Sequence, residues 1–591
     1  MKELILALIL SVSVSFAIFG NGISGDFVFD DVTVIQNRGD LTNPDNFFNL
    51  FISPYHQNSP KTGLFRPLTM ASYSLNHLIF GSSPVSFHVV NIIIHALNSA
   101  LVFWLIRYFY KSDPVPWIAF LLFLSHPIHT EAVTSIVGRA ELLAFFWALA
   151  TALLFLKGKR VLAGVSFLLA LMSKEVAVMV WPILLFIEWS VLGGKFIKSV
   201  KNILFLVVPF AVYSLMRYFA LGQYFSGDIS TTIVENPLKF TEWPERIYTA
   251  LKVLYMYAAR LIWPQHLSAD YSYNSIHVVS NILRSPEAIV GAVVLAALVW
   301  SLVNPKIRGT GYGLAAVLFL APYIIISNII VPVGTIMGER LMYFPSLGFV
   351  LFVALLFSKF ANPHFHKPAL AALVIILATY GLRTIVRNQD WHDARALFSA
   401  AAKESSDSLI IRTALAGVYI REGEWSEAKE QLDAAQAIHK DNSHLQNLLG
   451  IVADHDGDAS LAEAKFKKSL ELNPDAINSY INLGELYIRQ NRFEEAAPHF
   501  LKVIDFYAKA EYVIRYAYIE ISINNPNTAI EVIDKHFGLG TDNPDALSVI
   551  GTAYFVKGDY QQAVYYLKKA QELGNNIPDI ADMIRRAERA R

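Results

Sequence analysis

The chain has 591 residues, of which 54% are hydrophobic and 17% are charged, and its formal net charge is zero. A neutral chain offers no bulk electrostatic attraction to nucleic acid, and the absence of cysteine excludes disulfides, thiolate metal sites and cysteine nucleophiles. Long apolar runs fill the sequence to about residue 386, and a charged, alanine-rich sequence follows. This division predicts a polytopic membrane domain followed by a soluble domain.

The first apolar run extends from Leu4 to Phe19 and follows Lys2. A cleaved signal peptide has a similar charged start and apolar centre. No A-x-A cleavage site follows this run, however, and Phe16 and Ile18 fit such a site poorly. We therefore expect a retained first transmembrane helix.

The apolar runs predict about eleven membrane-spanning helices, several of which are short for a hydrocarbon core of about 30 Å. The predicted spans are Leu4–Phe19, Phe87–Phe109, Trp117–Ser125, Glu141–Leu156, Val161–Met172, Val176–Trp189, Ile203–Leu221, Ala288–Val303, Gly313–Ile330, Leu341–Phe357 and Ala369–Val386.

Clusters of basic residues orient these spans, because positively charged loops stay on the inner side. The clusters are Arg107/Lys111, Lys157/Lys159/Arg160, Lys195/Lys198/Lys201, Lys306/Arg308 and Lys359/Lys367. With the N-terminus inside, all of them fall in inner loops, provided that Glu245–Trp263 does not cross. Polar residues recur at helical spacing in that segment, which favours an interfacial helix. A tilted twelfth span is the alternative.

This orientation places the loops 20–86, 126–140, 173–175, 222–285 and 331–340, and everything after residue 386, on the outer side. These loops gather carboxylates, imidazoles and cationic groups next to helix ends. The residues concerned are Asp30, Asp31, Tyr55, His56, Arg66, His126, His129, Glu131, Arg139, Glu141, Lys174, Glu175, Glu339 and Arg340.

Two interpretations of this polar set compete. In the first, sequence neighbours form ordinary ion pairs that tie helix ends together, with the pairs Arg139–Glu141, Lys174–Glu175 and Glu339–Arg340. In the second, which we favour, the set lines one cavity. A site that transfers a group from a lipid phosphate needs a carboxylate base, cations for the phosphate and an apolar groove. The sequence supplies each of these.

A metal site is a separate possibility. His126, His129 and Glu131 are close enough in sequence to bind zinc, but Pro127 disfavours a regular helix across them. We expect no metal cofactor, and a divalent metal is the less favoured alternative.

The second half of the chain is repetitive. Alanines recur about every 34 residues, at Ala428, Ala462, Ala496, Ala529 and Ala563. Glycines recur with them, and Asn473-Pro474 marks the end of a unit. This pattern is typical of tetratricopeptide repeats, which pair helices and stack them around a concave, peptide-binding face. A stack that only caps or dimerises the protein is the alternative.

The predicted protein is therefore all-α, with a membrane domain at 1–388 and a superhelix of about five repeats at 389–591. The predicted repeats are 408–441, 442–475, 476–509, 510–542 and 543–576, and an irregular sixth unit precedes them at Trp391–Ala402.

Several motifs together resemble one known family. They are Asp30-Asp31, Phe65-Arg-Pro-Leu-Thr69, His126-Pro-Ile-His-Thr-Glu131 with Gly138-Arg-Ala-Glu141, Ser173-Lys-Glu175, Leu267-Ser-Ala-Asp-Tyr-Ser272 and Gly338-Glu-Arg-Leu-Met-Tyr-Phe-Pro-Ser346. The chain resembles, over nearly its whole length, the transmembrane and tetratricopeptide repeat-containing protein family. The resemblance implies a membrane domain of the GT-C glycosyltransferase fold, related to protein O-mannosyltransferases.

The resemblance also implies roles for individual residues. Asp30 would deprotonate the acceptor hydroxyl, Asp31 would hold the acceptor or tune its neighbour, and Glu131 would orient sugar or acceptor as a third catalytic residue. The residues that would bind the donor phosphate or sugar are Arg66, His126, His129, Arg139, Lys174 and Arg340. Because phosphate is already a good leaving group, no strong general acid is required.

We therefore expect an inverting enzyme that transfers a sugar, mannose by resemblance, from a polyprenyl-phosphate donor to Ser or Thr of a protein. The repeats would bind the acceptor, on the periplasmic side of a bacterial inner membrane or in the lumen of the endoplasmic reticulum. The alternatives are a non-catalytic membrane scaffold whose repeats recruit partners, and a related enzyme that modifies lipid or glycan.

Overall fold

The computed structural model describes residues 2–56, 62–111, 114–225, 231–359, 366–575 and 578–590, so residues 57–61 and 226–230 of two predicted outer loops lie outside it. The described residues form helices and turns without a strand, and the predicted all-α fold class is confirmed. The chain divides into two compact units, Met1–Leu415 and Ala416–Arg591.

The first unit is a bundle of helices with polar connections. Its helices are α1 (Lys2–Phe19), α2 (Pro67–Phe80), α3 (Pro84–Phe109), α4 (Val115–Ser125), α5 (Thr130–Val133), α6 (Arg139–Leu156), α7 (Arg160–Ser173), α8 (Val180–Phe186), α9 (Phe196–Ile203), α10 (Val207–Leu221), α11 (Trp243–Ile262), α12 (Pro286–Val303), α13 (Gly311–Ile326), α14 (Ser346–Lys359), α15 (His366–Asp390), α16 (Ala394–Glu404) and α17 (Leu409–Glu422), of which α17 continues into the second unit.

The apolar helices of this unit are those of a membrane protein. Among the described residues, six helical segments are long and apolar enough to cross a membrane: Lys2–Gly22, Pro84–Phe109, Ile136–Leu156, Phe196–Tyr224, Pro286–Val303 and Lys367–Asp390. The helices α4, α7, α13 and α14 are apolar but shorter. Each predicted apolar run overlaps a helix, and the count of about eleven spans stays a prediction.

The segment predicted to lie in the interface forms α11. This helix is not among the six segments that meet the length and hydropathy needed for a span in the described chain. One side of α11, including Leu254 and Tyr257, is buried, whereas Trp243 and Ile262 near its two ends are exposed. Such an amphipathic pattern is the one expected of an interfacial helix, and the interfacial position stays a prediction.

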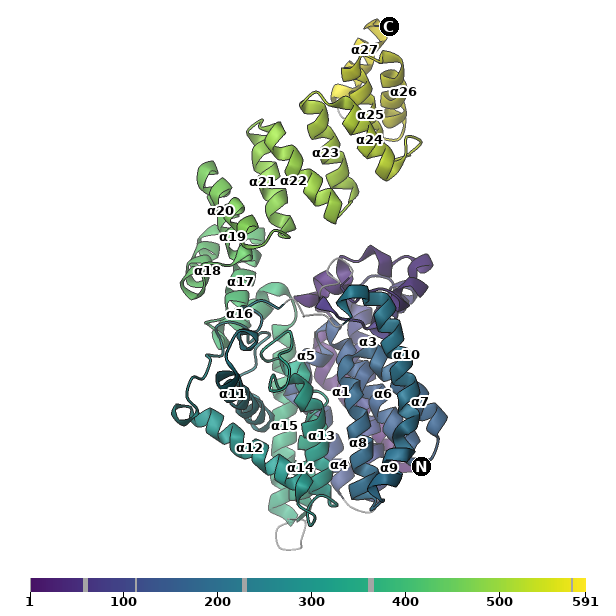
Figure 1. The fold of residues 1–591 in the computed structure, drawn as a ribbon, viewed down its shortest axis with the longest axis vertical. Helices are drawn as coiled ribbons and strands as arrows, with labels where there is room; N and C mark the ends of the chain where they lie inside the picture. The colour runs from purple at the N-terminus through teal and green to yellow at the C-terminus, as the bar shows by residue number, and fades with distance from the viewer. Residues whose placement is uncertain are drawn as a thin grey trace. The chain divides into compact units, whose positions relative to one another are not determined.

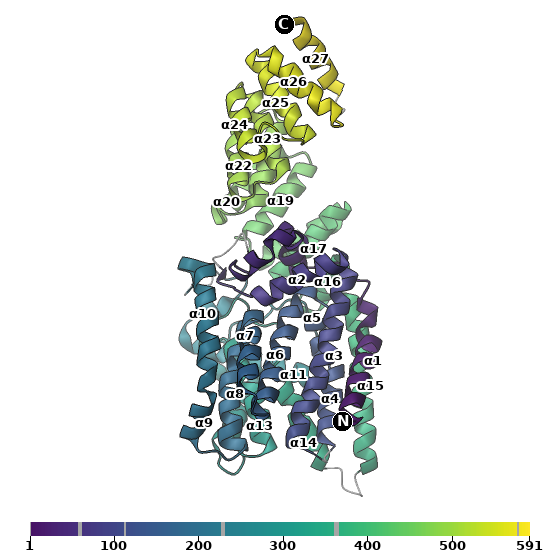
Figure 2. The same ribbon diagram turned by 90° about the vertical axis from the view of Figure 1, so that its right-hand side faces the viewer.

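The two ends of the bundle differ in charge. Figures 1 and 2 show the N-terminus and α9, which carries Lys198 and Lys201, at one end, and Figure 2 shows α2 and α5 toward the other. The end near α2 and α5 carries the connections that hold the predicted site residues. Basic and mixed-charge connections are therefore separated by the length of the bundle.

The second unit consists of paired helices, as predicted for tetratricopeptide repeats. Its helices are the remainder of α17, then α18 (Trp425–Ile438), α19 (Ser443–His455), α20 (Ala459–Leu472), α21 (Ile477–Arg489), α22 (Phe493–Phe506), α23 (Ala510–Ser522), α24 (Pro526–Phe537), α25 (Pro544–Lys557), α26 (Tyr560–Glu572) and α27 (Pro578–Ala590).

Side-chain caps begin α19, α20, α25 and α26. Asn442 accepts a hydrogen bond from the Leu445 amide at 2.9 Å, and Asp458 accepts one from Leu461 at 2.9 Å. Such caps satisfy amides that have no partner within the helix. The sequence thus specifies the start of these capped helices, whereas α18, α21, α22, α23 and α24 begin without a side-chain cap.

The predicted domain boundary and the compact unit differ. The prediction placed the boundary between residues 388 and 389, whereas the first unit extends to Leu415. Backbone hydrogen bonds at 2.8 Å join Leu409 to the Tyr273 carbonyl and Asn274 to the Asp407 carbonyl. The first helices after the last apolar helix therefore pack on a connection of the membrane unit.

We predict that Gly450→Ala destabilises the repeats, whereas Gly417→Ala does not. A Cβ atom at Gly450 would lie 2.5 Å from the buried ring of Phe466, whereas at Gly417 the nearest atom is 3.9 Å away. Overpacking costs about 1–3 kcal/mol, and an unhindered Gly→Ala change in a helix gains about 0.5–1 kcal/mol. Thermal unfolding of the full-length protein, followed by helical circular dichroism, measures both. Equal unfolding midpoints for the two variants would contradict the close crossing.

Candidate active site

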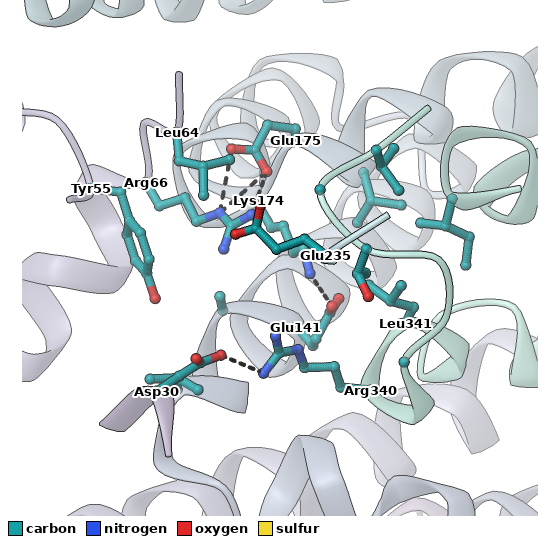
Figure 3. A pocket seen from close by; sticks show the side chains of 18 of the residues that line it. Asp30, Tyr55, Leu64, Arg66, Glu141, Lys174, Glu175, Glu235, Arg340 and Leu341 are labelled. Atoms are coloured by element: carbon teal, nitrogen blue, oxygen red, sulfur yellow. Dashed lines mark hydrogen bonds and ion pairs between the residues drawn. The ribbon is translucent and has the colours of Figure 1, made fainter. Parts of the chain in front are cut away.

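One end of the bundle contains a cavity of about 560 Å³. Residues from the loop after α1, from α5 and α6, from the connection after α7 and from the loops around α11 and α13 line it. Figure 3 shows charged side chains of Asp30, Arg66, Glu141, Lys174 and Arg340 directed toward a shared space. Segments far apart in sequence thus build one site.

Asp30 is the accessible member of the acidic pair. Its carboxylate lines the cavity, its side chain is 40% exposed, and Oδ2 lies 3.0 Å from Nη1 of Arg340. Arg340 also pairs with Glu131, because its backbone amide donates to Oε2 at 2.8 Å and Nε lies 3.5 Å from Oε1. One guanidinium therefore bridges two carboxylates at the cavity wall.

Burial makes the Glu131 carboxyl group a weaker acid than usual. Desolvation raises the pKa of Glu131 to about 7, against the opposing effect of the Arg340 charge. The two partners of Arg340 consequently differ, since Glu131 is buried and Asp30 is open to the cavity.

Asp31 has a different role from its neighbour. Its side chain is fully buried, and its carboxylate accepts hydrogen bonds from the amides of Val28 at 3.3 Å, Ile136 at 3.3 Å and Val137 at 2.8 Å. Burial raises the pKa of Asp31 to about 7, and these three amides oppose that rise. Asp31 does not line the cavity. It fastens the loop that carries Asp30 to the turn before α6.

Two further ion pairs lie in the cavity wall. Lys174 pairs with Glu141, and Arg66 forms a two-point contact with Glu175, with Nη2 3.0 Å from Oε2 and Nε 3.3 Å from Oε1. The Arg66 guanidinium also lies 4.9 Å from the centre of the Tyr55 ring. These carboxylates hold the cations in place within a partly buried wall.

The ion pairs are not between sequence neighbours. The local pairing interpretation joined Arg139 to Glu141, Lys174 to Glu175 and Glu339 to Arg340, and the structure forms none of these pairs. Glu141 and Glu175 instead bind Lys174 and Arg66, and Arg340 binds Asp30 and Glu131. The interpretation that the set lines one cavity agrees with this geometry for one part of it. The members that line the cavity are Asp30, Tyr55, His56, Arg66, Glu131, Glu141, Lys174, Glu175 and Arg340, whereas Asp31, His126, His129, Arg139 and Glu339 lie outside the lining.

Arg139 lies outside the cavity lining. Its side chain is fully buried, and its guanidinium donates to Asn91, Asn76 and the carbonyls of Phe87 and Ser72 at 2.8–3.3 Å. The predicted role in phosphate binding has no support in this position. Arg139 instead ties the start of α6 to α2 and α3.

The two predicted histidines are also packed away from the cavity. Nδ1 of His126 accepts from the Ile128 amide at 3.2 Å, and Nε2 is 2.9 Å from the Leu261 carbonyl oxygen. His129 is buried beside Tyr343, with its Nε2 atom 2.9 Å from Ser346 Oγ. Burial lowers the pKa of His126 to about 4 and that of His129 well below the usual value. Both are neutral core residues at physiological pH.

The zinc alternative also gains no support from this arrangement. Both ring nitrogens of His126 already have partners, and Glu131 is bound to Arg340. Among the described residues, no group of three or more His, Asp or Glu side chains is placed to hold a metal ion.

Sequence reasoning missed several cavity residues. Asp270, Glu235 and Arg217 line the cavity together with an apolar wall from the end of α13 and the following loop. Asp270 lies within the quoted motif 267–272, and Arg217 is a lone cation in an apolar segment, which is a recognised signal of function. Glu235 carried no comparable signal.

Comparisons with known proteins match this chain to one family model specific to TMTC proteins and to two tetratricopeptide repeat models. The family model described as "Protein O-mannosyl-transferase TMTC, DUF1736" matches residues 230–298, and tetratricopeptide repeat models match 386–451 and 465–497. The resemblance to the transmembrane and tetratricopeptide repeat-containing family is confirmed. The family-specific match includes Glu235 and Asp270, two cavity residues that the sequence analysis did not select.

Individual relatives extend this similarity along the chain. The mouse "Protein O-mannosyl-transferase TMTC3" is 28% identical over 531 residues, covering 83% of this chain and 54% of the relative. The Caenorhabditis elegans "Protein O-mannosyl-transferase F38B6.6" is 28% identical, covering 66% and 57%. The Drosophila melanogaster "Protein O-mannosyl-transferase Tmtc3" is 24% identical, covering 91% and 62%. The chain thus spans 54–62% of the length of these relatives.

We predict that Asp31→Ala destabilises the protein and that Asp30→Ala has little effect on stability. The first change leaves three buried amides unpaired, at a cost of about 1–3 kcal/mol for an unsatisfied buried group. The second removes a half-exposed partner while Arg340 keeps Glu131. The unfolding midpoints of the two variants in detergent provide the measurement. If the two midpoints agree, Asp31 does not anchor the loop.

Proposed function

We propose that the protein is a multi-pass membrane glycosyltransferase that transfers mannose from a polyprenyl-phosphate donor to Ser or Thr hydroxyls of a protein. The similarity to proteins named protein O-mannosyl-transferases supports this reaction class. We assign the chemistry to the cavity, because it combines an accessible carboxylate, cations and apolar side chains.

The placement of Asp30 carries the proposal. Its carboxylate is exposed in the cavity wall and pairs with Arg340. The next residue, Asp31, fixes the backbone at this point through its hydrogen bond with the Val137 amide. In the proposed reaction, Asp30 takes the proton of the acceptor hydroxyl while the hydroxyl oxygen bonds to C1 of the sugar. The bond from C1 to the phosphate oxygen breaks, and the configuration at C1 inverts.

The leaving phosphate requires positive charge close by. Lys174, Arg66 and Arg340 line the cavity, and each is held by a carboxylate. Burial lowers the pKa of Arg66 and Arg340, but the neighbouring carboxylates outweigh it and raise the pKa above the usual value, so these two guanidinium groups stay charged. Cations already in place stabilise the developing phosphate charge without rearrangement.

Part of the cavity lining is apolar and suits a lipid. Ile325 and Ile326 at the end of α13, with Val333 and Leu341 of the next segments, belong to this part. Apolar side chains bind the first part of an isoprenoid chain, whose sugar phosphate then faces the cations. The cavity lining therefore has cations for the sugar phosphate and apolar side chains for the lipid part of an amphipathic donor.

The acceptor and the membrane orientation complete the proposal. Concave faces of repeat stacks bind extended peptide, and we assign acceptor binding to the repeats. The bundle end with α9 carries lysines, which favours the inner side for that end. The cavity then lies on the periplasmic or lumenal side, where the lipid-linked sugar is used.

We expect Asp30→Asn to abolish transfer while leaving the fold intact. Asparagine is close in size to aspartate but cannot accept the hydroxyl proton. The test supplies purified protein in lipid with polyprenyl-phosphate mannose and a Ser/Thr-rich acceptor mixture, and detects a hexose mass gain by mass spectrometry. Mass gain in the wild type alone supports the enzyme, whereas equal gain in both proteins removes Asp30 as the base. No gain in either protein, with a partner bound to the repeats, favours a scaffold.

We also expect Lys174 to be required for turnover beyond its contribution to stability. Lys174→Met leaves the buried Glu141 unpaired, and breaking a buried pair costs about 3–5 kcal/mol. Adding Glu141→Gln removes the unpaired charge and restores most of the stability. The double variant should therefore unfold near the wild-type temperature yet transfer hexose poorly. Recovery of transfer along with stability would show that Lys174 serves only the fold.

A further inference from the structure

The segment between α15 and α17 has contacts that a simple connection to the repeats does not need. It belongs to the first compact unit, which ends at Leu415. The Asp393 side chain starts α16 by accepting from the Ala396 amide at 2.8 Å. We call residues 391–410 the α16–α17 corner. Its residue Ile410 lines the cavity.

The α16–α17 corner holds the loop that carries Asp30. The Asp26 amide donates to the His392 carbonyl at 2.8 Å. Phe29, directly before Asp30, packs edge-to-face on Phe398 of α16, with ring centres 5.8 Å apart and an interplanar angle of 86°. Phe398 is buried. The corner therefore contacts the loop through residues other than the Asp31 anchor.

Phe29 needs such support, because its backbone is strained. Its φ angle is +54°, in the left-handed region, which costs a residue with a side chain roughly 1–2 kcal/mol. Strained residues persist where the surrounding structure holds them. The Phe398 ring is a contact that can hold Phe29 in this conformation, and the direction of Asp30 follows from it.

The same corner holds a second cavity carboxylate, Asp270. Ser408 Oγ donates to Asp270 Oδ2 at 2.9 Å, and Ser405 Oγ donates to the Asp270 carbonyl at 3.1 Å. The Ser272 amide also donates to Oδ2, at 2.9 Å. In the described part of the chain, these bonds to the carboxylate end on Oδ2, which leaves Oδ1 for a ligand. Asp270 and Asp30 both line the cavity.

We propose that the α16–α17 corner is part of the active site, where Phe398 and Ser408 act as positioning residues for Asp30 and for Asp270, and that Asp270 binds the acceptor. An extended peptide presents backbone N–H groups, and a carboxylate oxygen held in place can accept a hydrogen bond from one of them. The assignment of Asp270 rests on the proposed transferase function. The positioning of the two carboxylates can be measured without turnover.

Ser408→Ala tests the hold on Asp270, with Ser406→Ala as the matched control. Ser406 is exposed two residues away, and among the described residues its hydroxyl bonds to the neighbouring Asp407 at 3.3 Å. The Ser408 hydrogen bond lowers the pKa of Asp270 against the rise that burial causes, so its loss should raise that pKa. We expect Ser408→Ala to shift the pH midpoint of carbodiimide labelling at Asp270 upward, read by peptide mass spectrometry. Ser408→Thr, which keeps the hydroxyl, should restore it.

In the transfer assay, the same variant should raise the acceptor KM about tenfold, the usual scale for a hydrogen bond to a charged group. The donor KM should not change, and Ser406→Ala should behave as the wild type. A purely structural loss would change both KM values or neither.

Asp30→Cys tests the contribution of Phe398. The chain has no cysteine, so this change creates a single thiol on the cavity wall. We compare its alkylation rate by a small methanethiosulfonate reagent in three backgrounds: otherwise wild type, Phe398→Ala, and Phe466→Ala. Phe466 is a phenylalanine of the second unit that is also buried. We expect a severalfold change in rate with Phe398→Ala and none with Phe466→Ala.

The outcomes separate this proposal from the proposed function. A wild type without transfer activity refutes the function, while the labelling midpoint and the thiol rate still decide the positioning. Equal labelling midpoints in Ser408→Ala and Ser406→Ala, or equal thiol rates in the three backgrounds, would overturn the role of the corner. An unchanged acceptor KM in an active Ser408→Ala variant would remove Asp270 from acceptor binding.

Discussion

A charge that leaves water needs a partner, and this constraint governs the cavity end of the bundle. Arg340 lies between Asp30 and Glu131, Lys174 lies beside Glu141, and Arg66 contacts Glu175. The partners are distant in sequence, with a separation of 310 positions from Asp30 to Arg340 and of 109 positions from Arg66 to Glu175. Pairing the charges therefore also closes the bundle at this end.

Sequence reasoning could predict the elements that depend on local signals. Apolar runs and the 34-residue period identified the helices, because amphipathicity, caps and close glycine crossings are properties of short segments. It also identified which segments meet at the site, since the predicted loops supply most of the cavity lining. Asp30, Arg66, Glu131, Lys174 and Arg340 were selected in this way, and the structure brings them together.

The roles of individual site residues depend on how deeply each side chain is buried, and burial can differ between adjacent residues. Asp30 and Asp31 are equivalent in sequence, yet only Asp31 faces three backbone amides. His126 and Arg139 have the chemistry of a binding site, but tertiary contacts with Leu261 and Asn91 place them in the core. Asp270 was not selected, because the sequence does not show that Ser408, which lies beyond the last apolar helix, folds back to bind it.

The size of the cavity limits what the site can distinguish. About 560 Å³ is the volume of a pocket for a drug-sized ligand, whereas a polyprenyl chain is far longer. A polyprenyl donor would place its sugar, its phosphate and its first isoprene units inside, and the rest of the chain would stay in the bilayer. The site would then select the head of its donor strictly and accept tails of many lengths, so lipid composition would affect supply more than recognition.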